Sequence, residues 1–283
     1  GKDDYSGDSP RPTISIKLSA LHPRYEVGQQ ARVMGEMADK VLQLIKQARA
    51  LDVGITIDAE EADRLELSLE LFEKLYRDPI TKGWGNFGLV VQAYSKRALP
   101  VLTWLAALAG EQGDRIPVRL VKGAYWDAEI KLCQQRGLSG YPVYTRKEAT
   151  DVSYLACARK LLDAPDAFYP CFATHNAHTL AAILEMAGET PFEFQRLHGM
   201  GEALYKAAGE ANRVRVYASV GAHKDLLPYL VRRLLENGAN SSFVNQIVDE
   251  KVAPEQVVAD PIKAHRPFAL TIGPKLFAPE RDN

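Results

Sequence analysis

The sequence contains little cysteine, no excess charge of either sign and no long apolar run. Three cysteines, Cys133, Cys157 and Cys171, are too few for a disulfide framework, so we expect reduced thiols in the core. Lys and Arg number 35 against 36 Asp and Glu, a net charge of −1, which excludes a global positive field for nucleic acid or an anionic membrane. The longest apolar stretch, residues 100–110, is shorter than the roughly 18 residues of a membrane span, and we expect a soluble protein.

The composition predicts a folded globular domain. With 283 residues, 46% hydrophobic and 25% charged, the chain can bury a sizeable core, and one α/β barrel of about 250 residues is compatible with this length. No linker, low-complexity tract or strong repeat divides it, so we expect a single domain over residues 1–283. The chain opens at Gly1 without a Met, and we expect an excised or processed piece of a longer protein.

Short β-branched runs alternate with helix-period segments. Seven candidate strands are Ile14–Ala20, Gly54–Ala59, Leu89–Ala93, Val118–Gly123, Tyr169–Thr174, Phe192–Leu197 and Val214–Val220. The first and last runs start 200 residues apart over six units, about 33 residues per unit, close to the roughly 31 of a (βα)8 barrel. A closed barrel needs eight strands, so the first strand is expected to be absent from this chain.

Polar residues fall where these strands end, which favours a barrel over an open doubly wound sheet. They are Lys17, Asp58, Gln92, Lys122, His175, His198 and Tyr217. The alternative is that polar loops begin at these points. In contrast, the glycines of GWGNFG (Gly83, Gly85, Gly88) match a dinucleotide fingerprint but precede a strand instead of following one, and we reject that interpretation.

Two further chemistries remain open from the residues alone. His175, His178, His198 and His223 could serve a metal-dependent barrel hydrolase, although no metal-binding motif is present and polar contacts at strand ends explain them more simply. Strand-end lysines such as Lys17 and Lys122 could form a Schiff base, but lysines in such places more often bind anions.

Arginines at two places in the sequence raise the question of what balances their charge. Arg119 lies inside an apolar strand, where a fixed charge requires either an acid from a neighbouring strand or a ligand. In the helix beginning near residue 225, Arg232, Arg233 and Glu236 lie opposite an apolar face; they are either solvated or form a carboxylate-binding fork.

Several segments together resemble one known family. SIKLSALHPRYE, TIDAEEADR, VRLVKGAYWDAEIK, YPVYTRKEATDVSYLACARKLL, FATHNAHT, FEFQRLHGMGE and YASVGAHKDLLPYLVRRLLENGANSSFVN resemble the proline dehydrogenase (PRODH) domain of the bifunctional bacterial proline utilisation flavoproteins, PutA. The resemblance implies a distorted (βα)8 TIM-like barrel that binds FAD. It also implies oxidation of L-proline to Δ1-pyrroline-5-carboxylate by hydride transfer to flavin N5, the first step of proline catabolism, with a quinone as electron acceptor.

The resemblance also implies roles for residues. Arg119 would stabilise the negative charge of the reduced flavin, with Lys17, Asp58 and Tyr217 as further catalytic residues. The substrate site would comprise Lys17, Tyr125, Leu197, Tyr229, Arg232, Arg233 and Glu236, in which the arginines hold the proline carboxylate. The cofactor would contact Asp58, Gln92, Arg119, Lys122, Gly123, Tyr125, Thr145, Lys147, Thr150, Thr174, His175, Asn176, Gln195, Arg233 and Phe243.

The sequence departs from the family pattern in three places. Nothing matches the family's first barrel strand and its glutamate, the connection around residues 205–213 is short, and no DNA-binding or aldehyde dehydrogenase segment is present. We therefore expect a minimal domain that binds no nucleic acid. A fragment that binds ligand without turnover is an alternative to the active enzyme. We expect a cytoplasmic protein, with the longer parent peripheral at the inner membrane.

Overall fold

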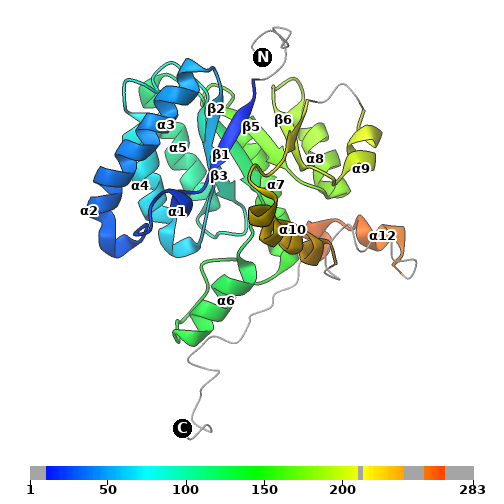
Figure 1. Cartoon of the computed structure of the whole chain (residues 1–283). Coiled ribbons are helices and arrows are strands. Elements are labelled where there is room, and N and C mark those ends of the chain that lie inside the picture. The colour runs from blue at the N-terminus through cyan, green and yellow to red at the C-terminus, as the bar shows by residue number, and fades with distance from the viewer. Residues whose placement is uncertain (1–10, 210–212, 239–251, 265–283) are drawn as a thin grey trace, which may run out of the picture.

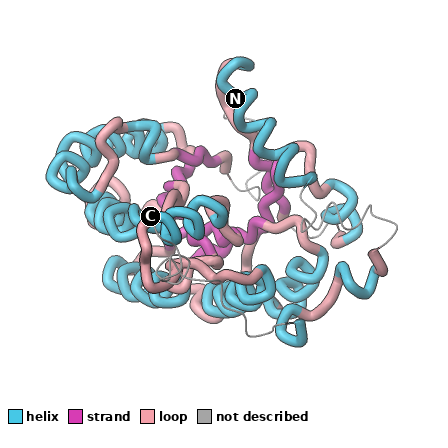
Figure 2. Tube along the Cα trace, turned by 90° about the horizontal axis from the view of Figure 1, so that it is seen from below, coloured by secondary structure: helices cyan, strands magenta, loops and turns pink. Residues whose placement is uncertain are grey.

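The computed structural model describes residues 11–209, 213–238 and 252–264, and in it seven strands form one parallel sheet in chain order. The strands are β1 (Thr13–Ile16), β2 (Gly54–Ile57), β3 (Phe87–Gln92), β4 (Ile116–Val121), β5 (Phe168–Ala173), β6 (Glu193–Leu197) and β7 (Val214–Tyr217). Figure 2 shows them on an arc around the interior, with the helices outside. This curled parallel sheet confirms the predicted α/β barrel class and all seven predicted strands.

The structure also contains helices, most of which connect the strands and cover the outer face of the sheet (Figure 1). They are α1 (Leu18–Leu21), α2 (Gln30–Arg32), α3 (Ala38–Ala50), α4 (Leu65–Tyr76), α5 (Ala98–Gln112), α6 (Trp126–Gln135), α7 (Lys147–Leu162), α8 (Ala177–Ala187), α9 (Glu202–Ala207), α10 (His223–Gly238), α12 (Pro254–Val257) and α13 (Pro261–Ala264). The first predicted strand was too long, because α1 begins at Leu18, directly after the strand-end residue Lys17.

The core lies between the sheet and these helices. In α3, Val41, Ile45 and Ala48 are buried at helical spacing. In α4 the buried side chains are Leu67, Leu71, Phe72, Leu75 and Tyr76, whereas Leu65 and Leu69 are only partly buried against the core. The apolar period therefore locates each helix, but the precise face is set by how the helix lies on the strands.

The glycines of GWGNFG serve the backbone, as expected. Gly83 and Gly85 have φ angles of 68° and 64° in the turn before β3. A Cβ on Gly88, inside β3, would lie 2.1 Å from the carbonyl oxygen of Pro117 in β4. A glycine is thus required where these two strands meet, and the motif opens no helix.

The two edge strands are linked through a side chain. Arg215 in β7 donates from Nη1 to the carbonyl oxygen of Arg11, two residues before β1, at 2.8 Å. Its Nε and Nη2 donate to the carboxylate of Glu193 in β6 at 2.6 and 2.8 Å. This arginine therefore connects both sides of the seam between β7 and β1.

The helical segment that leaves the sheet after β4 was not predicted. Helix α6 projects from the carboxyl side of the sheet (Figure 1) and packs on a small separate cluster of Tyr94, Ile130, Cys133, Tyr141 and Val143. All three cysteines are buried and free, which confirms the expected reduced thiols. Within the described residues, no helix combines the length and apolar character needed to cross a membrane.

Candidate active site

Arg119 is the centre of the candidate site. It projects from β4 into the interior, is 8% exposed, and donates to three strands: to Gln195 Oε1 at 2.6 Å, Asp58 Oδ1 at 2.9 Å and Ser15 Oγ at 2.6 Å. The ring of Tyr217, at the end of β7, lies 4.9 Å from the guanidinium carbon. Arg119 thus has the acid partner that the sequence left open, and one side chain fixes residues from four other strands of the curled sheet.

Asp58 follows β2 and lies between two cations. It pairs with Arg119, and its Oδ2 is 4.0 Å from Lys17 Nζ. Burial raises the pKa of this carboxyl, and the attraction of Arg119 and Lys17 only partly offsets the effect. Two cations therefore share one desolvated carboxylate, so the cluster carries a net positive charge when Asp58 is ionised.

Lys17 and Tyr125 meet at the more exposed side of this cluster. Lys17 Nζ donates to the Tyr125 hydroxyl at 3.2 Å and lies 5.8 Å from the centre of its ring. Burial lowers the pKa of Lys17, but the Tyr125 hydrogen bond and the nearby Asp58 and Glu60 outweigh burial, so the pKa is raised overall. Lys17 is consequently a protonated amine at neutral pH and a donor for an anion.

A second group of predicted residues lies at the ends of β3 and β4 and at the start of α7. Lys122 and Lys147 both pair with Asp151, and Lys147 Nζ lies 3.2 Å from Asp151 Oδ2. Burial lowers the pKa of Lys122. Gln92 donates to the carbonyl of Glu60 at 2.9 Å and accepts from the Ala124 amide at 3.3 Å. The lysines lie together, and their charges are shared with one carboxylate.

Gly123 directly follows Lys122, where the chain leaves β4. Its φ is 141°, and a Cβ there would lie 2.4 Å from the ring of Tyr94. The chain can therefore turn from β4 toward α6 only because this position has no side chain.

The predicted residues after β5 make local structural contacts. Asn176 caps α8 by accepting from the Thr179 amide at 2.9 Å, and Thr174 Oγ1 accepts from the Asn176 amide at 3.2 Å. His175 Nε2 accepts from the amide of Leu197 at 3.2 Å, which ties the end of β6 to the β5–α8 turn. These are the strand-end contacts offered above as the simpler explanation of the histidine.

Helix α10 carries the residues Tyr229, Arg232, Arg233 and Glu236, which the family resemblance assigns to the substrate. Figure 1 shows it below the strands, on the side of their carboxyl ends. Tyr229 in α10 is half-buried and interacts electrostatically with Tyr217. The side chains of Arg232, Arg233 and Glu236 lie outside the described residues, although their backbone is helical, and Phe243 lies outside them entirely.

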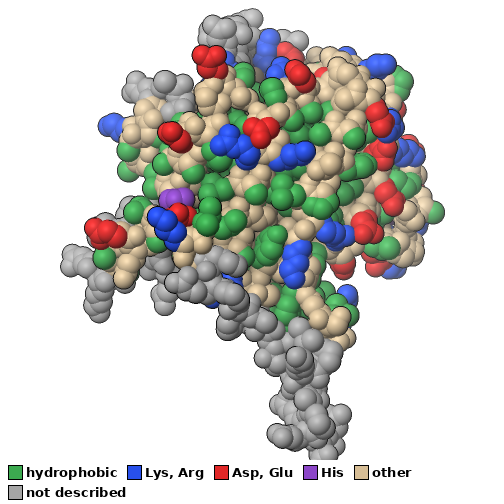
Figure 3. All heavy atoms as spheres, turned by 180° about the vertical axis from the view of Figure 1, so that it is seen from behind, with side chains coloured by type: hydrophobic (Ala, Val, Ile, Leu, Met, Phe, Trp, Pro, Cys, Tyr) green, Lys and Arg blue, Asp and Glu red, His purple; other side chains and the backbone are tan. Residues whose placement is uncertain are grey.

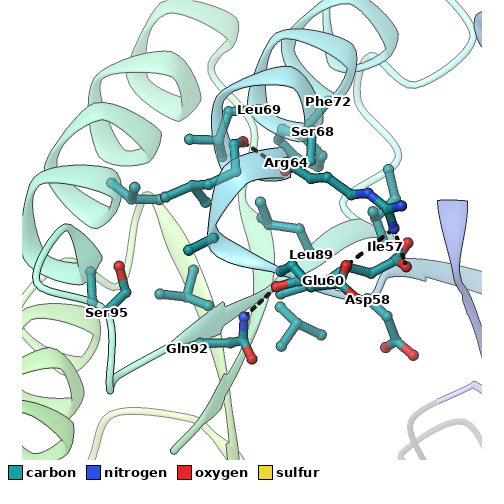
Figure 4. A pocket seen from close by; sticks show the side chains of 18 of the residues that line it. Ile57, Asp58, Glu60, Arg64, Ser68, Leu69, Phe72, Leu89, Gln92 and Ser95 are labelled. Atoms are coloured by element: carbon teal, nitrogen blue, oxygen red, sulfur yellow. Dashed lines mark hydrogen bonds and ion pairs between the residues drawn. The ribbon is translucent and has the colours of Figure 1, made fainter. Parts of the chain in front are cut away.

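A pocket adjoins the cluster on its helix side (Figure 4). Asp58, Glu60 and Gln92 line it near the strand ends, and Leu69, Phe72 and Leu89 line its apolar part. It lies between the sheet and α4, not in the interior that holds Arg119. Among the described residues, no group of three or more His, Cys, Asp or Glu is placed to hold a metal ion.

Four polar residues of the site were not predicted from the sequence: Ser15, Asp151, Glu193 and Arg215. Three of them were accessible from strand periodicity. Ser15, Glu193 and Arg215 each lie two residues before a strand residue already selected, namely Lys17, Gln195 and Tyr217, and side chains two apart share a face of a strand.

Known proteins of one family are similar to this chain over nearly its whole length. The family model described as "Proline dehydrogenase" matches residues 2–246. The curated Bifunctional protein PutA of Klebsiella aerogenes is 57% identical and that of Escherichia coli (strain K12) is 56% identical; in both cases the alignment covers 96% of this chain and 21% of the relative.

A solved structure of a PutA variant from Bradyrhizobium japonicum superimposes with a TM-score of 0.93 at 52% identity, covering 100% of this chain and 30% of that one. The chain therefore spans about a fifth of the length of the curated relatives.

Proposed function

The chain belongs to the proline dehydrogenase family, and on that premise we propose that it oxidises L-proline to Δ1-pyrroline-5-carboxylate with FAD as cofactor. The observation that carries the proposal is the cationic cluster of Arg119 and Lys17 at the carboxyl edge of the sheet, beside Tyr217. This edge is where parallel barrels place their active sites. A small amino acid carboxylate and an electron-accepting cofactor both require fixed positive charge there.

The donor set fits FAD. Lys122 and Lys147 would supply charge for the pyrophosphate, and Gln92, Thr150 and Asn176 would supply neutral donors and acceptors for the remaining polar atoms. Thr145, Gly123, Thr174, His175, Gln195 and Phe243 complete the proposed contacts. When bound, FAD would accept the C5 hydrogen of proline with its electron pair, while the nitrogen lone pair forms the C5–N double bond and the nitrogen proton leaves to solvent.

The protein's own residues would bind and orient the substrate. Lys17 is protonated at neutral pH, and with Arg232 and Arg233 it would neutralise the proline carboxylate. Glu236 would orient the two arginines.

The walls of the proposed pocket would limit the access of water. Leu197, Tyr125, Tyr217 and Tyr229 would cover the ring of the imino acid. Asp58 would hold Arg119 in place as its counter-ion, a role that its 2.9 Å contact supports.

The electron acceptor and cellular location follow from the same premise. We propose that a quinone takes the electrons, that the domain acts in the cytoplasm, and that the longer protein lies peripherally at the inner membrane. Reduction of a short-chain ubiquinone analogue by proline tests the first part, and an artificial dye supporting turnover where the quinone does not would refute it.

A visible spectrum of the purified protein, supplemented with FAD, tests the central proposal. We expect flavin absorbance that bleaches under anaerobic conditions on adding L-proline, and inhibition by tetrahydrofuran-2-carboxylate. A protein that holds FAD without bleaching is a non-turning-over fragment. A colourless protein that has a hydrolase activity, which a chelator abolishes, is the metal-dependent hydrolase. Either result refutes the proposed oxidation by this chain.

A further inference from the structure

Glu193 is a buried acid to which the proposed reaction gives no role. It lies in β6 with 1% of its surface exposed. Its carboxylate accepts two hydrogen bonds from Arg215, at 2.6 and 2.8 Å, and Oε1 also accepts from Gln195 Nε2 at 2.7 Å. The Tyr169 hydroxyl donates to Oε2 at 3.4 Å. The charge of Glu193 is thus fully paired, and one of its contacts leads directly to the candidate site.

The contact with Glu193 determines which way the Gln195 amide faces. Gln195 lies between a carboxylate and a guanidinium, with Nε2 toward Glu193 and Oε1 accepting from Arg119 Nε at 2.6 Å. An inverted amide would oppose its NH2 group to an N–H donor and its oxygen to a carboxylate. Both contacts would be repulsive in a site with little water to screen them, so only the observed orientation is satisfied.

The orientation of Gln195 in turn fixes Arg119. The planar guanidinium is held at three points, by Gln195, Asp58 and Ser15. Two contacts leave the group free to rotate about the line that joins them, and the third removes this freedom. We propose that Glu193 is a positioning residue that acts through Gln195 to hold the guanidinium plane of Arg119; this inference rests on the proposed function, in which Arg119 acts beside bound FAD.

The variant Glu193→Gln tests this inference, because an amide at position 193 can face Gln195 with either end. We expect the rate at which saturating proline bleaches bound FAD to fall about 10-fold, the loss of one well-oriented hydrogen bond to a charged group. The proline KM should stay within about twofold, and the midpoint potential of bound FAD should become more negative.

Two further variants separate positioning from general damage. Arg215→Lys keeps a cation beside Glu193 and leaves the contact between Glu193 and Gln195, but it removes the paired hydrogen bonds of the guanidinium, so it should lower the melting temperature without moving the FAD potential. In a Gln195→Leu background, Glu193→Gln should change the bleaching rate by less than about twofold, because the path to Arg119 is already cut. Additive effects of the two substitutions would overturn the inference.

A readout that needs neither cofactor nor turnover keeps the inference distinct from the proposed function. In flavin-free protein labelled with ¹⁵N at arginine Nε, Glu193→Gln should speed hydrogen exchange at Arg119 Nε at least about 10-fold relative to the parent. Unchanged exchange would overturn the positioning role. If the parent protein holds FAD but proline does not bleach it, the proposed oxidation fails, and this exchange measurement still decides the role of Glu193.

Discussion

Replacing Arg119 by lysine keeps the positive charge of the site but removes the guanidinium group and its three donating nitrogens. The arginine donates to Gln195, Asp58 and Ser15 at 2.6 to 2.9 Å, on three sides of one planar group. A lysine ammonium at this depth can reach one of these acceptors at normal length, which leaves two without a donor. Since a hydrogen bond to a charged group contributes about 1.5–3 kcal/mol, Arg119→Lys should lower the free energy of unfolding by about 3–6 kcal/mol.

Urea unfolding of the flavin-free protein, followed by circular dichroism at neutral pH, measures this loss without any cofactor effect. Arg77→Lys is the matched control, because Arg77 also pairs with two acids, Glu73 and Glu111, but at the exposed surface. We expect it to change stability by less than about 1 kcal/mol. If Arg119→Lys costs no more than this control, the three-point fork is not what holds the site together.

Three further predictions concern a residue proposed to bind the substrate, a backbone position and a buried thiol. Arg232→Met should raise the proline KM strongly with little loss of bound FAD, because Arg232 is proposed to bind only the proline carboxylate; equal loss of flavin and proline affinity would refute this role. Gly123→Ala should cost about 2–5 kcal/mol in urea unfolding, because its Cβ meets the Tyr94 ring. Gly137→Ala, at a φ of 64° with open space, should cost about 1–2 kcal/mol, and equal costs would contradict the packing argument. Burial raises the pKa of Cys157 to about 11, from 9.0, so the stability it contributes is present below pH 9 and lost as pH rises through about 11. A Cys157→Ala variant should therefore lose less stability over this interval, and native-state labelling of Cys157 by iodoacetamide at pH 8 would contradict its burial.

The sequence was sufficient to predict the sheet because parallel strands buried on both faces give continuous apolar runs. All seven strands were found, with ends displaced by up to four residues. The largest error was at Leu18, where an apolar residue that continues the strand pattern begins a helix instead. The excursion of α6 was missed because its apolar residues, such as Ile130, pack on a small local cluster and give a weak helical signal.

The candidate site was predicted in part. Polar residues at strand ends located Lys17, Asp58 and Tyr217, and the structure brings them together around Arg119. What the sequence could not provide was the pairing within the interior. Glu193 and Arg215 read as an ordinary acid and base on neighbouring strands, and only the curvature of the sheet brings Arg215 to Arg11.

The hydrogen bonds from Arg119 to three strands limit which substitutions this fold can accept during evolution. Arg119, which would contact the cofactor, also joins three strands of the sheet through Gln195, Asp58 and Ser15. A substitution that alters its chemistry therefore also destabilises the fold. Stabilising substitutions elsewhere in the core would then have to precede any change at this position.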